Sequence, residues 1–328
     1  MFLIRHWFVT LSTGFFLHAG LQGGAIAQQP AFPAKTVRFI APFSAGGSTD
    51  ILARLVAQHM NKQWGQSVIV DNRPGAGGNI GAEVVAKSPP DGHVLLLSAS
   101  SVAINPSLYK KMPFDTVRDL APVGLVGTTP NILVVHPSLP VQTVRELISL
   151  AQKERGALTY ATGGSGTGSH LIAELFQYET KIKFTHIPYK GSGPGTIALL
   201  SGEVALAFNN LLAAMPHVRN GKMRAIAVTS ASRDTSLPKV PTVSESGIPG
   251  FEADSWYGVF TTGGTPTEVV RMLNQVLVKI VDSAEVRNRL NALGVVPKTP
   301  TAAEFQRFMA TEMEKWATVV KISNATVE

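Results

Sequence analysis

Short runs of β-branched residues alternate with apolar residues at helical spacing along most of this chain. Residues 37–40 and 68–70 read as strands, and the apolar residues between 51 and 60 recur at the three- and four-residue spacing of a helix. The alternation restarts at residues 132–135 and continues to 225–228. This β–α–β pattern predicts an α/β fold with mainly parallel sheets flanked by helices.

The restart of the pattern predicts two units. A chain of 328 residues is long for one hydrophobic core and comfortable for two. Residues 256–261 read as a strand that returns to the first unit, so we expect lobe 1 to comprise residues 28–128 and 255–328, and lobe 2 to comprise residues 129–254. Two units joined by more than one crossing leave a cleft, which is where ligands bind in such folds.

The first 27 residues have the pattern of a secretory signal peptide. Arg5 supplies a positive charge, residues 7–24 are mainly apolar, and Ala25-Ile26-Ala27 fits a small-x-small cleavage site before Gln28. The alternative is a transmembrane anchor, but the stretch is short, is broken by glycine and lacks a basic stop-transfer flank. We expect export to the periplasm, with no membrane insertion after cleavage.

Composition narrows the classes of function. The chain has 45% hydrophobic and 16% charged residues, so it is globular. It has no cysteine, which excludes disulfides, thiolate metal sites, a cysteine nucleophile and a lipoprotein anchor. The net charge of +7 suits an anionic ligand or the cell envelope. The basic residues are scattered, so we expect no nucleic-acid partner.

Two glycine-rich loops occupy equivalent places in the two units. Residues 42–50 join a predicted strand to a predicted helix, and residues 161–170 do the same in the second unit. Glycines let the backbone approach a ligand, and a helix N-terminus adds partial positive charge. Together the loops form a candidate carboxylate or phosphate site without basic side chains. Asp50 is expected to bond loop amides at the helix start rather than act as an acid.

A third loop, residues 71–79, also joins a strand to a helix. It could form a wall of the cleft, but a structural turn held by Arg73 is the favoured interpretation. The glycine-rich loops at residues 42–50 and 161–170 have neither the Lys-Ser/Thr ending of a P-loop nor the G-x-G-x-x-G spacing, so neither loop is diagnostic of a function by itself.

Signatures of an enzyme are missing from the sequence. There is no G-x-S-x-G elbow and no H-E-x-x-H motif. Ser165 with His170 is the best nucleophile and base that can be assembled, and His170 with Glu174 could form half of a metal site. We expect neither catalysis nor a metal, and no cofactor.

Several longer segments carry a family resemblance, in order over essentially the whole mature chain. The segments are residues 42–50, 70–78, 90–93, 160–171, 188–191, 221–229, 238–242 and 255–258. In these segments the chain resembles the Bug family, the extracytoplasmic receptors of tripartite tricarboxylate transporters. The resemblance implies a two-lobed fold of the class II periplasmic-binding-protein type, with a cleft that holds a carboxylate through loop amides and ordered water.

The resemblance also implies which residues contact the ligand. The first loop should hold one carboxylate, the second loop should meet the same group from the other lobe, and aromatic side chains should line the cleft. Asn209 stands where many family members carry Asp, and its amide could receive a second polar or anionic group. The candidate ligand-binding residues are Phe43, Ser44, Ala45, Gly46, Gly47, Asp50, Gly164, Ser165, Gly166, Thr167, His170, Tyr189, Asn209 and Trp256.

The sequence therefore predicts a periplasmic receptor that captures a small organic acid and delivers it to the permease subunits of a tripartite tricarboxylate-type transporter. The lobes should close on the ligand, and a monomer is expected. Two alternatives remain open, a ligand-binding sensor of a signalling system and an enzyme that acts on an anionic substrate in the same cleft. The sequence leaves the identity of the acid open.

Replacing Gly46 by Val is expected to abolish binding of the organic acid while leaving the fold intact, because backbone approach and loop geometry are lost. Isothermal titration would measure the affinity, and circular dichroism would verify the fold. Normal affinity in the variant would remove the first loop from the site.

Overall fold

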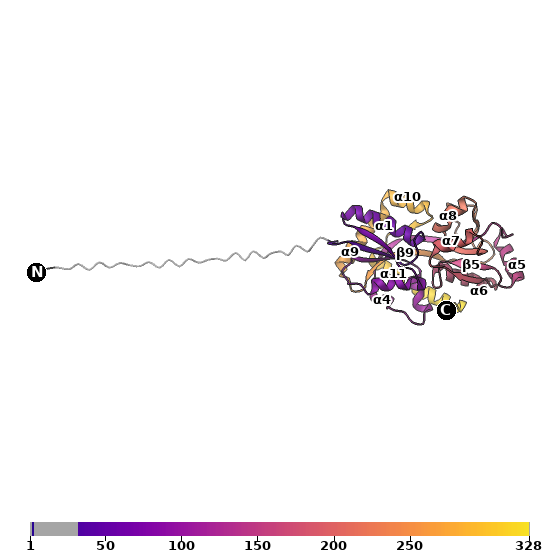
Figure 1. Ribbon diagram of the computed structural model, residues 1–328, viewed down its shortest axis with the longest axis horizontal. Helices are drawn as coiled ribbons and strands as arrows, with labels where there is room; N and C mark the ends of the chain where they lie inside the picture. Colours follow the sequence, from indigo (N-terminus) through magenta and orange to yellow (C-terminus); the bar gives the residue numbers. More distant parts are fainter. Residues whose placement is uncertain (1, 3–31, 328) are drawn as a thin grey trace. The chain divides into compact units, whose positions relative to one another are not determined.

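The computed structural model describes residue 2 and residues 32–327, and Phe32–Glu328 forms one compact unit (Figure 1). The predicted signal peptide lies outside the described residues. The strands are β1 (Val37–Ala41), β2 (Val68–Asn72), β3 (Val94–Ala99), β4 (Leu120–Val135), β5 (Thr159–Thr162), β6 (Thr185–Pro188), β7 (Leu206–Asn210), β8 (Arg224–Val228), β9 (Asp254–Thr262) and β10 (Val296–Pro297).

The helices occupy the intervals between these strands and the C-terminal region. They are α1 (Ser48–Trp64), α2 (Asn79–Ala86), α3 (Ser101–Leu108), α4 (Thr116–Asp119), α5 (Val144–Glu154), α6 (Gly168–Thr180), α7 (Ser192–Leu200), α8 (Leu211–Arg219), α9 (Thr267–Asp282), α10 (Ala284–Ala292) and α11 (Ala302–Ser323), with a 3₁₀ turn at Ala76–Gly78. Among the described residues, none of the helices has the length and apolar character needed to cross a bilayer.

The strands form two groups that share β4. One group contains β1, β2, β3 and β9, and the other contains β5, β6, β7 and β8. The order along the main path is β2-β1-β3-β9-β4-β7-β5-β6, with β8 and β10 also paired to β4. Strands β1, β2 and β3 pair in parallel, as do β5, β6 and β7, which confirms the predicted β–α–β units. The strands that join the groups, β4 and β9, pair antiparallel with their neighbours.

Strand β4 crosses from one group to the other. Its first part, Leu120 to Pro130, pairs with β9, and its second part, Asn131 to Val135, pairs with β7 and β8. The sequence pattern predicted only the second part, residues 132–135. The first part, with two prolines and two glycines, has little strand propensity of its own and is held extended by its pairing with β9.

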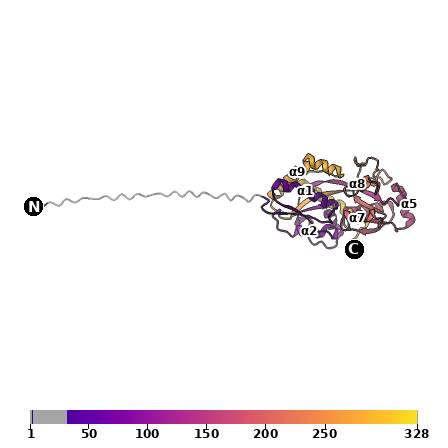
Figure 2. The ribbon, with the colours of Figure 1, turned by 45° about the horizontal axis from the view of Figure 1, so that its top comes forward.

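Alternate residues of the central strands face two hydrophobic cores. In β1, Phe39 packs with α1 and α9, whereas Ile40 packs with the side that contains α2, α3 and α11. Leu95 and Leu96 of β3 divide in the same way. Figure 2 shows α9 and α2 on opposite sides of this group of strands. The period of two in a strand therefore explains why helices are needed on both faces.

Helix α11 is attached to the crossing strands through a buried carboxylate. Oε2 of Glu312 accepts hydrogen bonds from the indole nitrogens of Trp256 on β9, at 2.8 Å, and Trp316, at 2.9 Å. Nζ of Lys315 lies 3.5 Å from the other carboxylate oxygen. The helix begins at a capping box, in which Thr301 and Glu304 satisfy each other's backbone amides.

Replacing Glu312 by Ala is expected to lower the free energy of unfolding by about 2–4 kcal/mol, because two buried indole N–H groups lose their acceptor at roughly 1–3 kcal/mol each. Urea denaturation would measure the change. The matched control is Glu314→Ala, which removes an exposed carboxylate from the same helix and should change stability by less than about 0.5 kcal/mol. Equal losses in the two variants would contradict the role of Glu312.

Candidate ligand-binding site

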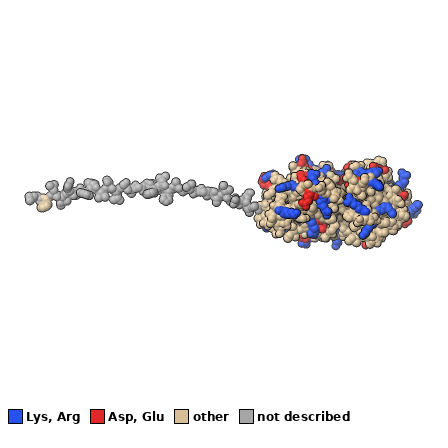
Figure 3. Space-filling view, turned by 90° about the horizontal axis from the view of Figure 1, so that it is seen from above, with Lys and Arg blue, Asp and Glu red and all other residues tan. Residues whose placement is uncertain are grey.

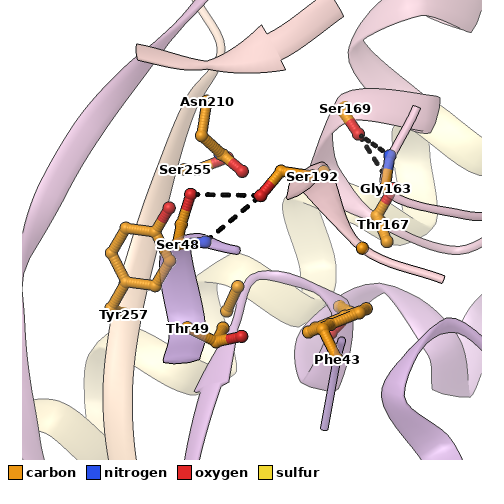
Figure 4. A pocket seen from close by; sticks show the side chains of 14 residues that line it. Phe43, Ser48, Thr49, Gly163, Thr167, Ser169, Ser192, Asn210, Ser255 and Tyr257 are labelled. Atoms are coloured by element: carbon orange, nitrogen blue, oxygen red, sulfur yellow. Dashed lines mark hydrogen bonds between the residues drawn. The ribbon is translucent and has the colours of Figure 1, made fainter. Parts of the chain in front are cut away.

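A small internal cavity lies where the two groups of strands meet (Figure 4). Its volume of about 30 Å³ exceeds the roughly 10–15 Å³ that one water molecule needs. Every residue that lines it is uncharged. These residues are Phe43, Ser48, Thr49, Ala99, Ser101, Gly163, Thr167, Gly168, Ser169, Gly191, Ser192, Asn210, Ser255 and Tyr257.

Five helices begin at this cavity. Ser48, Ser101, Gly168 and Ser192 are the first residues of α1, α3, α6 and α7, and Asn210 is the N-cap of α8. Each of these helices follows the carboxyl end of a parallel strand, which is why their N-termini converge. The first amides of a helix have no partner within it and carry partial positive charge. The cavity is therefore electropositive without any basic side chain.

Side-chain hydroxyls supply most of the remaining polar surface of the cavity. Figure 4 shows the hydroxyls of Ser48 and Ser192 directed at one another and the hydroxyl of Ser169 directed at the Gly163 amide. The buried hydroxyls of Thr49 and Tyr257 have no hydrogen-bond partner among the described residues. Burial also raises the pKa of Tyr257, so its hydroxyl keeps its proton. Buried polar groups are normally satisfied, so the orphaned hydroxyls indicate that a polar guest or water completes the site.

The first predicted loop contributes to the cavity through its ends. Phe43 and Ser48 line it, whereas Ala45 and Gly46 line a groove on the outside. The amide of Gly46 donates to Oδ2 of Asp50 at 2.9 Å, so Asp50 holds the loop as expected. Gly46 has a φ of 78°, which a β-branched residue such as Val rarely adopts, and this strain gives a structural reason for the predicted loss of binding on substitution.

Asp50 is a charged anchor rather than a cavity residue. Oδ1 of its carboxylate lies 2.9 Å from the guanidinium of Arg54, one helical turn away. Burial acts to raise the pKa of Asp50, but the Arg54 guanidinium and the Gly46 amide outweigh it and lower the pKa. The carboxylate therefore stays ionised and fixes the conformation of the loop.

The second predicted loop also divides between the inner cavity and the outside. Thr167 lines the cavity, and its hydroxyl donates to the carbonyl of Gly164 at 2.6 Å. Gly164 and Ser165 line an outer hollow that also includes Tyr109 and Lys190. Gly166 packs against Asn105, and its amide donates to Nδ1 of His170 at 3.3 Å. This loop therefore reaches the inner cavity at its two ends, through Gly163 and through Thr167 to Ser169, and not through its middle.

Hydrogen bonds between the two halves of the fold close the cavity. The amide of Ser44 donates to the carbonyl of Lys190 at 2.9 Å, and the amide of Ser48 donates to Oγ of Ser192 at 3.2 Å. The Tyr109 hydroxyl donates to the carbonyl of Ser165 at 3.3 Å. These contacts hold the walls of the small cavity together.

Three further predicted side chains, Trp256, Tyr189 and Asn209, also lie outside the inner cavity. Trp256 is buried behind the wall, against Phe305 and Glu312, so it supports the wall instead of lining it. Tyr189 lines the outer groove, and its hydroxyl donates to Glu203. Asn209 points to the opposite face of β7 and donates to Thr196 at 2.7 Å. Its neighbour Asn210 lines the cavity instead, because successive strand residues face opposite sides.

Sequence reasoning did not assign roles to Ser101, Ser192, Asn210, Ser255 or Tyr257, all of which line the cavity. Ser192 had a detectable signal, because a serine between Gly191 and a Gly-Pro pair is typical of a helix start. Ser255 and Tyr257 flank Trp256 in a segment of the family resemblance, and the alternation of a strand places them on the face opposite to the tryptophan.

His170 is part of a buried histidine pair behind the second loop. Its ring stacks on His186, with ring centroids 4.5 Å apart, and its Nδ1 accepts from Gly166. The ring of His170 is thus oriented away from the role of a base for Ser165. Its Nε2 lies 4.0 Å from Glu174, whose carboxylate accepts from Tyr160. Within the described residues no group of three or more potential metal ligands is found.

The chain matches a known family over most of its length. Residues 52–325 match the model described as the tripartite tricarboxylate transporter family receptor. Protein BugT of Bordetella pertussis is 39% identical over 299 residues, which cover 90% of this chain and 92% of BugT.

Solved structures resemble this fold closely. The structure of an R. palustris protein with adipate has a TM-score of 0.87 and 37% identity, and covers 90% of this chain and 100% of its own. MatC from Rhodopseudomonas palustris with bound malate has a TM-score of 0.85 and 32% identity, and covers 88% of this chain and 100% of its own. The periplasmic binding protein BugD has a TM-score of 0.87 and 32% identity, with 90% and 100% covered.

Stability is expected to fall as the pH falls from about 6.5 toward 4. Burial lowers the pKa of His170 to about 4 and that of His186 to about 3, so protons bind to these histidines in the unfolded chain first. Asp254 acts with the opposite sign, because burial raises its pKa to about 6 and the folded state takes up that proton first.

Urea denaturation at pH 7, 6 and 5 would separate these contributions. The free energy of unfolding of His186→Gln should depend less steeply on pH than that of the parent protein, and that of Asp254→Asn should depend more steeply. The same pH dependence in all three proteins would contradict the assignment.

Proposed function

Because the chain belongs to the tripartite tricarboxylate transporter receptor family, we propose that it captures a small organic acid in the inner cavity and delivers it to a transporter of that type. The resemblance seen in the sequence is thereby confirmed, and so is the predicted class of α/β fold. The family consists of solute receptors, which favours binding over catalysis as the role of this chain.

The observation that carries the proposal is the convergence of five helix N-termini on an uncharged, hydroxyl-lined cavity. Helix N-termini bind carboxylates and phosphates through their free amides. Hydrogen bonds to a charged group contribute roughly 1.5–3 kcal/mol each, so a few of them approach the roughly 8 kcal/mol of a micromolar site. Carboxylate binding here does not need the basic side chains, which Figure 3 shows spread among acidic ones over one face of the molecule.

The ligands of two relatives suggest the class of acid. One R. palustris protein was solved with adipate and MatC was solved with malate, and both compounds carry two carboxylates. We propose a small dicarboxylate for this chain. One carboxylate would lie between the starts of α1 and α6, held by Ser48, Thr49, Thr167 and Ser169. The outer parts of the two predicted loops would not contact it.

Opening of the cavity would require the two halves to separate. We propose that residues 28–128 and 255–328 move as one lobe and residues 129–254 as the other, with β4 and β9 as the connection. The contacts from Ser44 to Lys190 and from Ser48 to Ser192 would break on opening. Closure would also form the outer groove of Ala45, Gly46 and α7, and this joint surface is our candidate for contact with the permease subunits.

BugD is a periplasmic binding protein, which supports the periplasm as the location of this chain and residues 1–27 as its signal peptide. A receptor that must close and then dock on a permease can act as a monomer, and we propose that state here.

A thermal-shift screen against organic acids, with sugars and cations as controls, tests the proposal. Succinate, malate and adipate should raise the melting temperature, because a ligand at 100 times its dissociation constant adds about 2.7 kcal/mol of stability. The screen should be repeated on protein that has been denatured and refolded, which removes any retained ligand. A response to sugars or cations alone would overturn the proposed carboxylate site.

A further inference from the structure

Asn131 lies where β4 passes from one group of strands to the other. Its side chain is fully buried, with 0% exposure, and it does not line the cavity. The residue before it, Pro130, pairs with Asp254 of β9, whereas Asn131 itself pairs with Asn210 of β7. The Asn131 side chain therefore sits between the two strands that carry the cavity residues Ser255 and Asn210.

Two hydrogen bonds of Asn131 have a defined direction. Its Nδ2 donates to Oγ of Ser255 at 2.8 Å, and its Oδ1 accepts from Nδ2 of Asn210 at 3.3 Å. Its backbone is held as well, because its amide donates to Oγ1 of Thr229 at 2.9 Å and its carbonyl accepts from the Thr229 amide. Main-chain and side-chain bonds together leave Asn131 little freedom to turn.

The direction of these bonds determines what Ser255 presents to the cavity. A serine hydroxyl has one proton to donate and two lone pairs, and the bond from Asn131 uses one lone pair without using the proton. The Ser255 proton is therefore free to point into the cavity, toward the start of α6. The two are close, since a Cβ placed on Gly168, the first residue of α6, would lie 3.0 Å from Oγ of Ser255. A hydroxyl that accepts one hydrogen bond is also a stronger donor in the next.

We propose that Asn131 is a positioning residue that orients Ser255 as a hydrogen-bond donor to an oxygen of the bound acid. The inference rests on the proposed function and deepens it. An ammonium group at this end of the cavity would find only the one lone pair that Asn131 leaves on Ser255, and it would face the partial positive charge of the helix starts. The site therefore selects a carboxylate or hydroxyl oxygen there and discriminates against amino acids of the same length.

The test uses two ligands that differ at one end, adipate and 6-aminohexanoate, titrated into the parent protein and Asn131→Asp. In the variant the new carboxylate accepts from Ser255, turns its proton away from the cavity and adds negative charge. Affinity for adipate should fall roughly 10- to 100-fold, as expected for losing one charge-assisted hydrogen bond. Affinity for 6-aminohexanoate should fall much less or rise. Equal losses for the two compounds, or none, would overturn the proposal.

Asn274→Asp is the matched control. Asn274 is a buried asparagine on α9 that donates to the carbonyls of Val123 and Pro300, away from the cavity. Its substitution should lower the melting temperature without changing the preference between adipate and 6-aminohexanoate. A changed preference in this control would show that lost stability alone alters selectivity, and would count against Asn131.

A second measurement needs no ligand and does not depend on Asn131→Asp being able to fold. In Ser255→Ala the side-chain amide of Asn131 loses its acceptor, so its NMR resonances and those of Asn210 should shift together. Unchanged resonances would show that the Asn131 side chain does not link Ser255 to Asn210 through hydrogen bonds, and would overturn the inference. If the parent protein binds none of the acids, the proposed function fails, and this measurement still decides the role of Asn131.

Discussion

The partial positive charge at the starts of helices is the interaction on which this structure depends. Five helices begin at the inner cavity because each follows the carboxyl end of a parallel strand. The parallel groups must meet end to end for these helix starts to face one another. The antiparallel strands β4 and β9 bring the groups together, since both strands pair with one another over most of their length.

An uncharged site has consequences for how a receptor works. A basic side chain would hold an anion strongly but would be costly to bury without a partner once the ligand has left. Backbone amides and hydroxyls can be satisfied by water in the empty site and by carboxylate oxygens in the filled one. Charges are kept one layer away, as in the ion pair of Asp50 with Arg54 and the buried Glu312 that attaches α11 to Trp256.

Local pattern was sufficient for the elements but not for the site. The predicted strands at 37–40, 68–70 and 225–228 correspond to β1, β2 and β8. The glycine loops were correctly placed between strands and helices. Their division between the inner cavity and the outer hollows was not predictable, because it depends on which loop atoms face the other half of the fold.

The sequence by itself determined the α/β class, the repeated β–α–β pattern and the family, because periodicity and motif order are local or linear properties. Only the tertiary structure decided which polar groups share the cavity. Ser192, Asn210 and Ser255 come from distant segments and meet there, and Trp256 turns away while its two neighbours face inward. The direction of the hydrogen bonds through Asn131 is likewise set by strand register, which brings residues more than 70 positions apart into contact and leaves no trace in linear spacing.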